Sequence, residues 1–143
     1  MKKRYVLIPV YKPGETLLSF IQALEERNLR VIVVDDGSGE EYLPLFQKIK
    51  DNTGAKIIQL EQNRGKGAAL KAGLSYLQTL DGNFQIITVD ADGQHSLQDT
   101  LFLLEEGEEH ENCLLLGSRT QSGSSPLRSR LGNAITRKVF SLT

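Results

Sequence analysis

The chain has 143 residues and a formal net charge of −1, with 39% hydrophobic and 24% charged residues. These proportions are typical of one globular domain, or a large part of one, and they exclude a collagen-like or intrinsically disordered chain. The single cysteine, Cys113, excludes an internal disulfide and a cysteine-rich metal site and favours a reducing compartment. No apolar run approaches the roughly 20 residues that span a bilayer.

Five short apolar segments predict the strands of a sheet, at residues 5–8, 31–34, 56–58, 85–89 and 113–116. Several are continuously apolar rather than alternating, which is typical of strands covered on both faces. The intervals between them are long enough for right-handed crossover connections between parallel strands.

Each of the four intervals has apolar residues three or four positions apart, which predicts a helix in each. The apolar positions are, in chain order, Leu17, Leu18, Ile21 and Leu24; Leu43, Phe46 and Ile49; Ala69, Leu70, Gly73, Leu74 and Leu77; and Leu97, Leu101 and Leu104. The alternation predicts an α/β fold, an open and mostly parallel sheet with helices on both faces.

The end of the chain differs from the rest in charge. Residues 119–143 carry five basic and no acidic side chains, whereas residues 1–118 carry 12 basic and 18 acidic ones. A basic segment favours an anionic partner, such as a phosphate group, a membrane surface or a nucleic acid. The apolar spacing there predicts a helix with one face formed by Leu127, Leu131, Ile135, Val139 and Leu142. This helix either packs on the sheet or lies at a membrane surface as a basic amphipathic helix.

We therefore expect an α/β core at residues 1–118 and a basic amphipathic segment of the same domain at residues 119–143. The chain stops at Thr143 without a closing strand. This ending predicts a domain that is incomplete at its C-terminus.

Polar turns follow three of the predicted strands: Pro9-Val10-Tyr11, Asp35-Asp36-Gly37-Ser38 and Asp90-Ala91-Asp92-Gly93-Gln94. In open parallel sheets, ligands bind beyond the carboxyl ends of the strands. We therefore expect these three turns to converge on one edge of the sheet.

The pair Asp90 and Asp92 is suited to a hard divalent cation, because Mg²⁺ and Mn²⁺ prefer carboxylate and amide oxygens and complete their shells with phosphates and water. Gln94 and His95 are near enough in sequence to join such a site. The alternative is structural, since Asp92 or Ser96 could equally cap the helix that follows.

Two other motifs are less specific. Asp35 and Asp36 could accept hydrogen bonds from a nucleobase or a ribose hydroxyl, or could form an Asx-turn. The segment 63–67 combines glycines, two cations (Arg64 and Lys66) and a predicted helix start, which suits an anion, although glycine-rich loops are also common for steric reasons.

Several sequence motifs of other binding sites are absent. There is no Walker A loop and no Gly-x-Gly-x-x-Gly after the first strand, and Leu101 stands where an EF-hand loop needs Glu. Asp90-Ala91-Asp92-Gly93 mimics the nucleophile turn of a haloacid-dehalogenase-type phosphatase. That alternative lacks support, because no aspartate follows Asp99.

Taken in order, five motifs resemble the family 2 glycosyltransferases of GT-A fold. They are Val6-Leu7-Ile8-Pro9-Val10-Tyr11, Val33-Val34-Asp35-Asp36-Gly37-Ser38, Asn63-Arg64-Gly65-Lys66-Gly67-Ala68-Ala69, Asp90-Ala91-Asp92-Gly93-Gln94-His95 and Gly117-Ser118-Arg119. Pro126-Leu127-Arg128-x-Arg130-Leu131-Gly132-Asn133 is similar to the polyprenyl-phosphate (dolichol-phosphate) mannosyl- and glucosyltransferase branch.

The resemblance implies roles for individual residues. The nucleotide would be bound by Pro9, Tyr11 and Asp36, with Asp35 and Glu15 as weaker candidates, and by Lys66 and Asp90. Mg²⁺ or Mn²⁺ would be held by Asp90, Asp92 and Gln94. Arg119, with Arg128 or Arg130, would hold the acceptor phosphate or the departing diphosphate, so Asp92 and Arg119 are the expected catalytic residues.

The resemblance also implies the partners: a UDP- or GDP-linked sugar as donor, a polyprenyl phosphate as acceptor, and no nucleic acid. A hydroxyl acceptor needs a carboxylate base, whereas a phosphate oxygen is already anionic, and no Asp or Glu follows residue 111. We expect a cytoplasmic protein, at the cytoplasmic face of the membrane in its full length. The alternative is an inactive homologue that only binds a nucleotide sugar.

Overall fold

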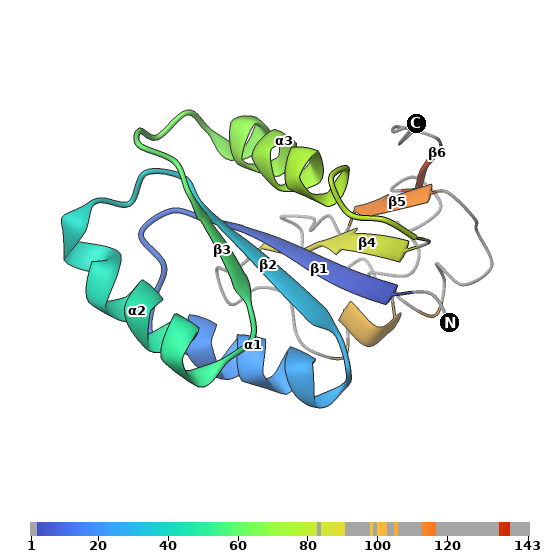
Figure 1. Ribbon diagram of the computed structural model, residues 1–143, viewed down its shortest axis with the longest axis horizontal. Helices are drawn as coiled ribbons and strands as arrows, with labels where there is room; N and C mark the ends of the chain where they lie inside the picture. Colours follow the sequence, from blue (N-terminus) through green and yellow to red (C-terminus); the bar gives the residue numbers. More distant parts are fainter. Residues whose placement is uncertain are drawn as a thin grey trace, which may run out of the picture.

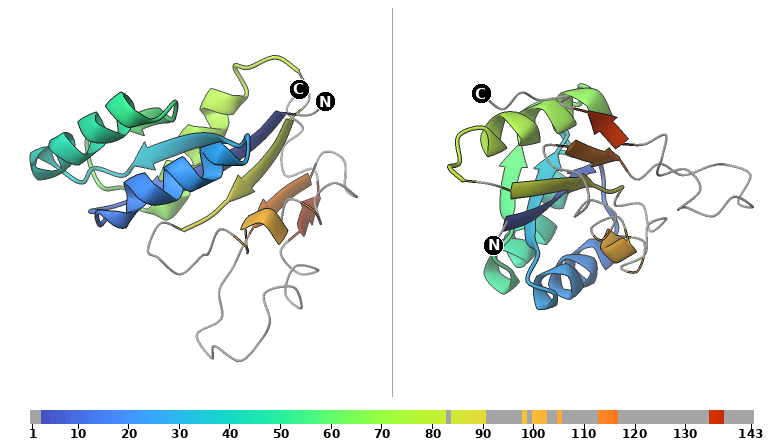
Figure 2. Two further views of the ribbon diagram at one scale, coloured as in Figure 1. Left: turned by 90° about the horizontal axis from the view of Figure 1, so that it is seen from below. Right: turned by 90° about the vertical axis from the view of Figure 1, so that its right-hand side faces the viewer.

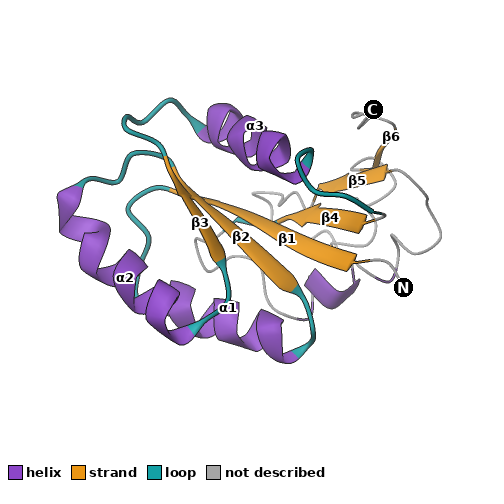
Figure 3. Ribbon diagram, viewed as in Figure 1, coloured by secondary structure: helices purple, strands orange, loops and turns teal. Residues whose placement is uncertain are grey.

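The computed structural model describes residues 3–82, 84–90, 98, 100–102, 105, 113–116 and 135–137. Its strands form one six-stranded sheet in the order β3-β2-β1-β4-β5-β6 (Figures 1 and 3). The strands are β1 (Lys3–Val10), β2 (Arg30–Asp35), β3 (Lys56–Gln59), β4 (Phe84–Thr88), β5 (Cys113–Leu116) and β6 (Ile135–Arg137). The first five run parallel, and β6 is antiparallel to β5.

The order of the strands reverses beside β1. The chain passes outward from β1 to β2 and β3, and then crosses back so that β4 pairs with the other side of β1. Such a reversal opens a crevice beyond the carboxyl ends of the two strands, because the following loops leave toward opposite faces of the sheet. The topology therefore predicts a ligand site after Val10 of β1 and Thr88 of β4.

Helices cover both faces of the sheet (Figure 2). Helices α1 (Thr16–Glu26) and α2 (Leu43–Asn52, preceded by the 3₁₀ turn η1, Glu40–Tyr42) lie on one face, and α3 (Lys66–Leu77) lies on the other. Residues 98, 100–102 and 105 are also helical. The predicted α/β sheet with helices on both faces is thus confirmed.

The alternation of side chains along β1 divides the core into two layers. Val6, Ile8 and Val10 pack with the buried leucines and isoleucines of α1 and α2, while Tyr5 and Leu7 pack with α3. Each such side chain is at most 7% exposed, and burying an aliphatic residue of this size stabilises the fold by about 1.5–3 kcal/mol. This explains why the central strands are apolar at every position.

Gly73 lets α3 approach the sheet closely. A Cβ atom built there would overlap the Leu7 side chain and would lie 3.1 Å from Cγ2 of Val34. Because Gly73 has no side chain, α3 can lie close to Leu7 of β1 and Val34 of β2. Its first residue, Lys66, is thereby held near the carboxyl ends of the strands.

The structure corrects one prediction. Ile135–Arg137 forms β6 and pairs with Cys113–Leu115, so the helix expected from the apolar spacing of Leu127 to Leu142 is wrong at these residues. Ile and Thr favour strands, and among the described strands β6 covers the edge of β5 that faces away from β4. The rest of 119–143 lies outside the described residues, and the boundary at residue 118 remains a prediction.

No helix within the described part of the chain is both long enough and apolar enough to cross a membrane.

Candidate functional site

The described segments that follow β1, β2 and β4, as far as Asp90, lie together at the carboxyl edge of the sheet. The backbone N–H of Asp36 donates to the carbonyl of Val10 (2.8 Å), and the N–H of Val89 donates to the carbonyl of Leu7 (3.1 Å). These hydrogen bonds continue the strand pairing past β2 and β4. The segments after β1, β2 and β4 therefore leave the sheet side by side, as the sequence predicts.

Asp35 closes the turn after β2. Its side chain is buried (3% exposed), and its Oδ1 accepts a hydrogen bond from the backbone N–H of Ser38 (3.0 Å). This is the structural alternative that the sequence left open for the carboxylate. Its carbonyl also accepts from the N–H of Leu60 (2.8 Å), which ties the end of β3 to the end of β2.

Asp36 anchors the glycine-rich loop that leads into α3. Its carboxylate is 4% exposed, with Oδ1 accepting from the N–H of Arg64 (2.8 Å) and Oδ2 from the N–H of Gly65 (2.9 Å). Hydrogen bonds to an ionised acceptor are about twice as strong as neutral ones. Each carboxylate oxygen has a second lone pair, so the anchoring leaves acceptor capacity for a nucleoside.

The turn after β2 packs directly on this loop at Gly37. Its φ of +70° is in the left-handed region, and a Cβ atom there would overlap the backbone of Gln62 and Asn63. Glycine is therefore required both for the conformation and for the contact. Asp36 and Gly37 together fix the loop 62–65 against the end of β2.

Lys66 forms an ion pair with Asp90. The Nζ of Lys66, at the first residue of α3, contacts Oδ1 of Asp90, which follows β4. Both side chains reach solvent, with 59% of Lys66 and 30% of Asp90 exposed. The loop before α3 thus links the end of β2, through Asp36, to the end of β4, through Asp90, and brings together three predicted nucleotide-binding residues.

The turn after β1 presents Tyr11. Its ring is 48% exposed, and the Nζ of Lys12 lies 5.4 Å from the ring centroid. The N–H of Lys12 donates to the Oγ of Ser38 (2.7 Å), which joins the turns after β1 and β2. Sequence reasoning missed this role of Ser38, although its place directly after Asp-Asp-Gly was the available signal.

Two other predicted residues of the nucleoside pocket are described. Pro9 is half-buried within β1 and pairs with Val34 of β2. Glu15 is exposed at the N-cap position of α1, where its side chain makes no capping hydrogen bond. Unlike the Asp36 carboxylate, the Glu15 side chain therefore has no capping hydrogen bond that fixes its position.

The remaining predicted site residues lie outside the described residues: Asp92, Gln94, His95, Arg119, Arg128 and Arg130. Within the described part of the chain, no three His, Cys, Asp or Glu side chains are grouped closely enough to hold a metal ion. Of the predicted metal ligands, the structure thus places Asp90 alone.

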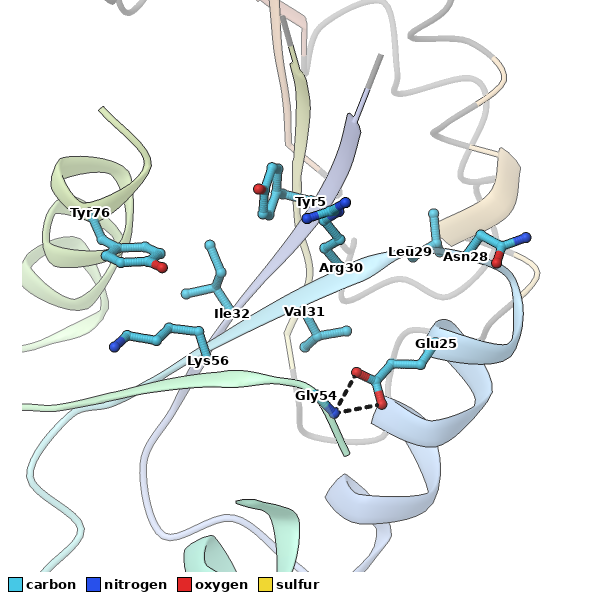
Figure 4. A pocket seen from close by; sticks show the side chains of 10 residues that line it. All are labelled: Tyr5, Glu25, Asn28, Leu29, Arg30, Val31, Ile32, Gly54, Lys56 and Tyr76. Atoms are coloured by element: carbon cyan, nitrogen blue, oxygen red, sulfur yellow. Dashed lines mark hydrogen bonds between the residues drawn. The ribbon is translucent and has the colours of Figure 1, made fainter. Parts of the chain in front are cut away.

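A groove of about 500 Å³ lies at the opposite, amino edge of the sheet (Figure 4). It contains none of the predicted site residues, and it is lined by Tyr5, Glu25, Asn28, Leu29, Arg30, Val31, Ile32, Gly54, Lys56 and Tyr76. Both carboxylate oxygens of Glu25 accept from the N–H of Gly54 (3.1 and 2.9 Å), and Lys56 Nζ lies 5.2 Å from the centre of the Tyr76 ring. The groove is separate from the carboxyl edge, where the topology predicts the ligand site.

A family model described as "Glycosyl transferase family 2" matches residues 5–141. The chain belongs to glycosyltransferase family 2. The predicted family is thereby confirmed, and the phosphatase alternative is set aside.

Two curated relatives carry transferase or synthase names. The UDP-N-acetylglucosamine–dolichyl-phosphate N-acetylglucosaminyltransferase of Methanococcus voltae is 26% identical over 147 residues, covering 90% of this chain and 58% of that protein. A poly-β-1,6-N-acetyl-D-glucosamine synthase of Staphylococcus aureus (strain COL) is 33% identical over 93 residues, covering 59% of this chain and 22% of that protein. The chain thus spans about three fifths of the first of these relatives and about a fifth of the second.

Among solved structures, the chain resembles S. aureus TarS, with a TM-score of 0.56 and 23% identity over 87% of this chain and 23% of TarS. The structure titled as TarS 1–349 in complex with UDP-GlcNAc gives a TM-score of 0.50 and 24% identity, over 87% of this chain and 37% of that one. This likeness concerns the fold, and with the family it confirms the GT-A class.

Proposed function

We propose that this chain is the donor-binding part of a glycosyltransferase that moves a sugar from a nucleoside-diphosphate sugar to an acceptor. The observation that carries the proposal is the linkage of Asp36, Lys66 and Asp90 through one loop at the crevice between β1 and β4. Family membership supports the same reaction class. The names of the relatives favour a UDP-linked N-acetylhexosamine as the donor, within the broader class of UDP- and GDP-linked sugars.

The nucleoside would lie against the turns after β1 and β2. The exposed ring of Tyr11 offers a stacking surface for the base, beside Pro9. Asp36 retains acceptor capacity for a base N–H or a ribose hydroxyl, and Asp35 and Glu15 are further candidates for this role. The diphosphate would then extend toward Lys66 and the start of α3, where an ammonium group and free helix N–H groups favour an anion.

The carboxyl end of β4 suits a divalent cation. Asp90 supplies a hard oxygen ligand, and the ammonium group of Lys66 against it indicates that a positive charge is stable there. Asp92 and Gln94 are the proposed further ligands for Mg²⁺ or Mn²⁺. The ion would neutralise the negative charge that builds on the departing diphosphate.

For the acceptor we propose a polyprenyl phosphate. A phosphate oxygen forms the new bond to the anomeric carbon, while the bond from that carbon to the diphosphate breaks and the diphosphate leaves with the electron pair. The attacking oxygen is already anionic, so no general base is needed. Arg119, with Arg128 or Arg130, would hold the acceptor phosphate or the departing diphosphate, with Asp92 and Arg119 as the catalytic residues. With a lipid-linked acceptor, we propose that the protein acts at the cytoplasmic face of the membrane.

The test is calorimetry of the chain with UDP, UDP-GlcNAc and a GDP-linked sugar, with and without Mn²⁺. We expect nucleotide binding that requires Mn²⁺ and is lost in Asp92→Ala. Asp81 is an exposed residue in the loop before β4, so Asp81→Ala is the control and should bind the nucleotide as the original chain does. Failure to bind any nucleotide, or tight binding with no metal requirement, would contradict the proposal. Binding without sugar transfer to a polyprenyl phosphate would instead identify a non-catalytic homologue.

A further inference from the structure

We infer that Ser38 is a positioning residue of the donor site, whose hydroxyl fixes the turn after β1 so that the ring of Tyr11 is held in place for the nucleobase. The inference rests on the proposed function, in which Tyr11 is the stacking surface. It adds a residue that acts on nucleotide binding through Tyr11 rather than by contact with the nucleotide.

Ser38 is fixed in the turn after β2. It is only 6% exposed, and its backbone N–H donates to Oδ1 of Asp35 (3.0 Å), which is itself buried. Gly37, directly before it, packs against the backbone of Gln62 and Asn63. The Ser38 hydroxyl is therefore held at a defined position.

Two hydrogen bonds from this turn bracket Tyr11. On the side of β1, the N–H of Asp36 donates to the carbonyl of Val10 (2.8 Å). On the other side, the Oγ of Ser38 accepts from the N–H of Lys12 (2.7 Å), which lies 26 residues away in the sequence. The backbone of Tyr11 is thus tied to the turn after β2 through both of its neighbours.

The second of these bonds holds Lys12 in a backbone conformation that lysine disfavours. Its φ is +49°, in the left-handed region, where the Cβ atom of an L-residue is crowded. Pro13 follows, and a residue before proline favours an extended backbone with a φ of about −120°. Such a conformation persists only where its surroundings hold it, and the Ser38 hydroxyl provides this hold. Without the hydroxyl, we expect Lys12 to relax toward negative φ and to turn Tyr11 with it.

The orientation of the Tyr11 ring follows that of its backbone, because packing fixes an exposed side chain poorly. Tyr11 is 48% exposed, and Nζ of Lys12 lies 5.4 Å from the ring centroid, so the residue with the left-handed backbone also contacts the ring. A ring that is oriented before binding loses less conformational freedom when a base stacks on it. Loss of the Ser38 hydroxyl should therefore weaken base stacking without removing the ring.

The experiment is a double-mutant cycle of Ser38→Ala and Tyr11→Ala, with the Kd for UDP measured by calorimetry in the presence of Mn²⁺. In the original chain we expect Ser38→Ala to raise the Kd about three- to tenfold, the range of one hydrogen bond. In the Tyr11→Ala chain, the same change should raise the Kd by less than about twofold, because the ring that Ser38 positions is gone. Ser38→Thr keeps the hydroxyl and should keep the affinity of the original chain.

Ser19→Ala is the matched control, because the hydroxyl of Ser19 also bonds to a backbone group, the carbonyl of Thr16 (3.0 Å), but within α1. It should leave the Kd for UDP unchanged. If Ser38→Ala fails to fold by circular dichroism, Ser38→Cys gives the same cycle, since a thiol of nearly the same size is a weak hydrogen-bond acceptor.

Two outcomes in a folded Ser38 variant overturn the inference and leave the donor site standing. One is a Kd that does not rise, and the other is a Kd that rises by the same factor with and without the Tyr11 ring, which would show that Ser38 does not act through that ring. Failure of the original chain to bind UDP overturns the proposed function, and the inference with it.

Discussion

The two edges of the sheet use their polar side chains differently. At the carboxyl edge, Asp35 and Asp36 are almost fully buried and accept hydrogen bonds from backbone N–H groups of the surrounding loops. At the amino edge, the half-buried Glu25 accepts from the exposed N–H of Gly54, and the cations Arg30 and Lys56 lie open to solvent. One edge is cross-linked by buried carboxylates, and the other is an open groove.

This difference indicates where the molecule is organised in advance of binding. A buried carboxylate that holds two N–H groups of another segment restricts both segments, whereas an exposed contact is weakened by water and salt. Loops that must present several groups to one ligand benefit from such restriction, because less conformational freedom is lost on binding. The comparison predicts larger effects of mutation at the carboxyl edge than at the amino edge.

The largest effect is expected from Gly37→Ala. The added Cβ would overlap the backbone of Gln62 and Asn63, and alanine disfavours the φ of +70°, so we expect the free energy of unfolding to fall by about 4 kcal/mol. Urea denaturation measures it. Gly14→Ala is the control, because nothing lies within 4 Å of a Cβ there, and it should change stability by less than about 0.5 kcal/mol. Equal losses in the two variants would show that the loops are not packed as described.

Asp36→Ala is expected to cost about 3 kcal/mol of unfolding free energy, because it leaves the N–H groups of Arg64 and Gly65 without their ionised acceptor. The same variant should abolish detectable UDP binding by calorimetry, since Arg64 and Lys66 lose their position. Asp51→Ala removes an exposed carboxylate that accepts from the Gln47 side chain, and it should cost less than about 0.5 kcal/mol. A stable Asp36→Ala variant would remove the distinction between the two edges.

The strands and the contacts of Asp36 show which parts of the fold and of the site can be predicted from the sequence alone. The strands are predictable because continuous apolar runs such as 31–34 have only one stable placement, between two helical layers. The convergence of Asp36 and Asp90 is predictable because parallel strands end at the same edge. The anchor on Arg64 and Gly65 is not, because its donors are backbone groups that every residue except proline carries.

The failure at β6 has a similar cause. Ile135 and Thr136 fit a helical apolar stripe and also have high strand propensity, so a local pattern cannot choose between them. The choice depends on whether β5 offers a free edge, which is a property of the assembled sheet. Likewise, the Lys66–Asp90 pair joins two residues that are 24 positions apart in the sequence, so no local pattern predicts it.

Tyr11→Ala tests whether the carboxyl edge of the sheet also binds the nucleotide. We expect the Kd for UDP in the presence of Mn²⁺ to rise about tenfold, the lower part of the range for loss of one base-stacking ring, with little change in unfolding free energy. Leu43→Ala is the matched control, because Leu43 is exposed to the same extent (48%) but lies at the start of α2. Calorimetry measures both. If the two variants weaken UDP binding equally, Tyr11 has no specific role.

The smallest effect is expected from Glu25→Ala at the amino edge. Its carboxylate accepts from one exposed N–H, that of Gly54, so we expect a loss of about 0.5–1 kcal/mol in unfolding free energy. Because the groove there contains none of the proposed donor-binding residues, the affinity for UDP should stay unchanged.

The two edges are compared most directly by the ratio of two losses of unfolding free energy, that of Glu25→Ala divided by that of Asp36→Ala. Urea denaturation measures both losses in low and high salt. Exposed contacts are screened by salt and buried ones much less, so the ratio should fall as salt rises. A ratio near one at any salt concentration would show that burial of the carboxylates does not organise the carboxyl edge.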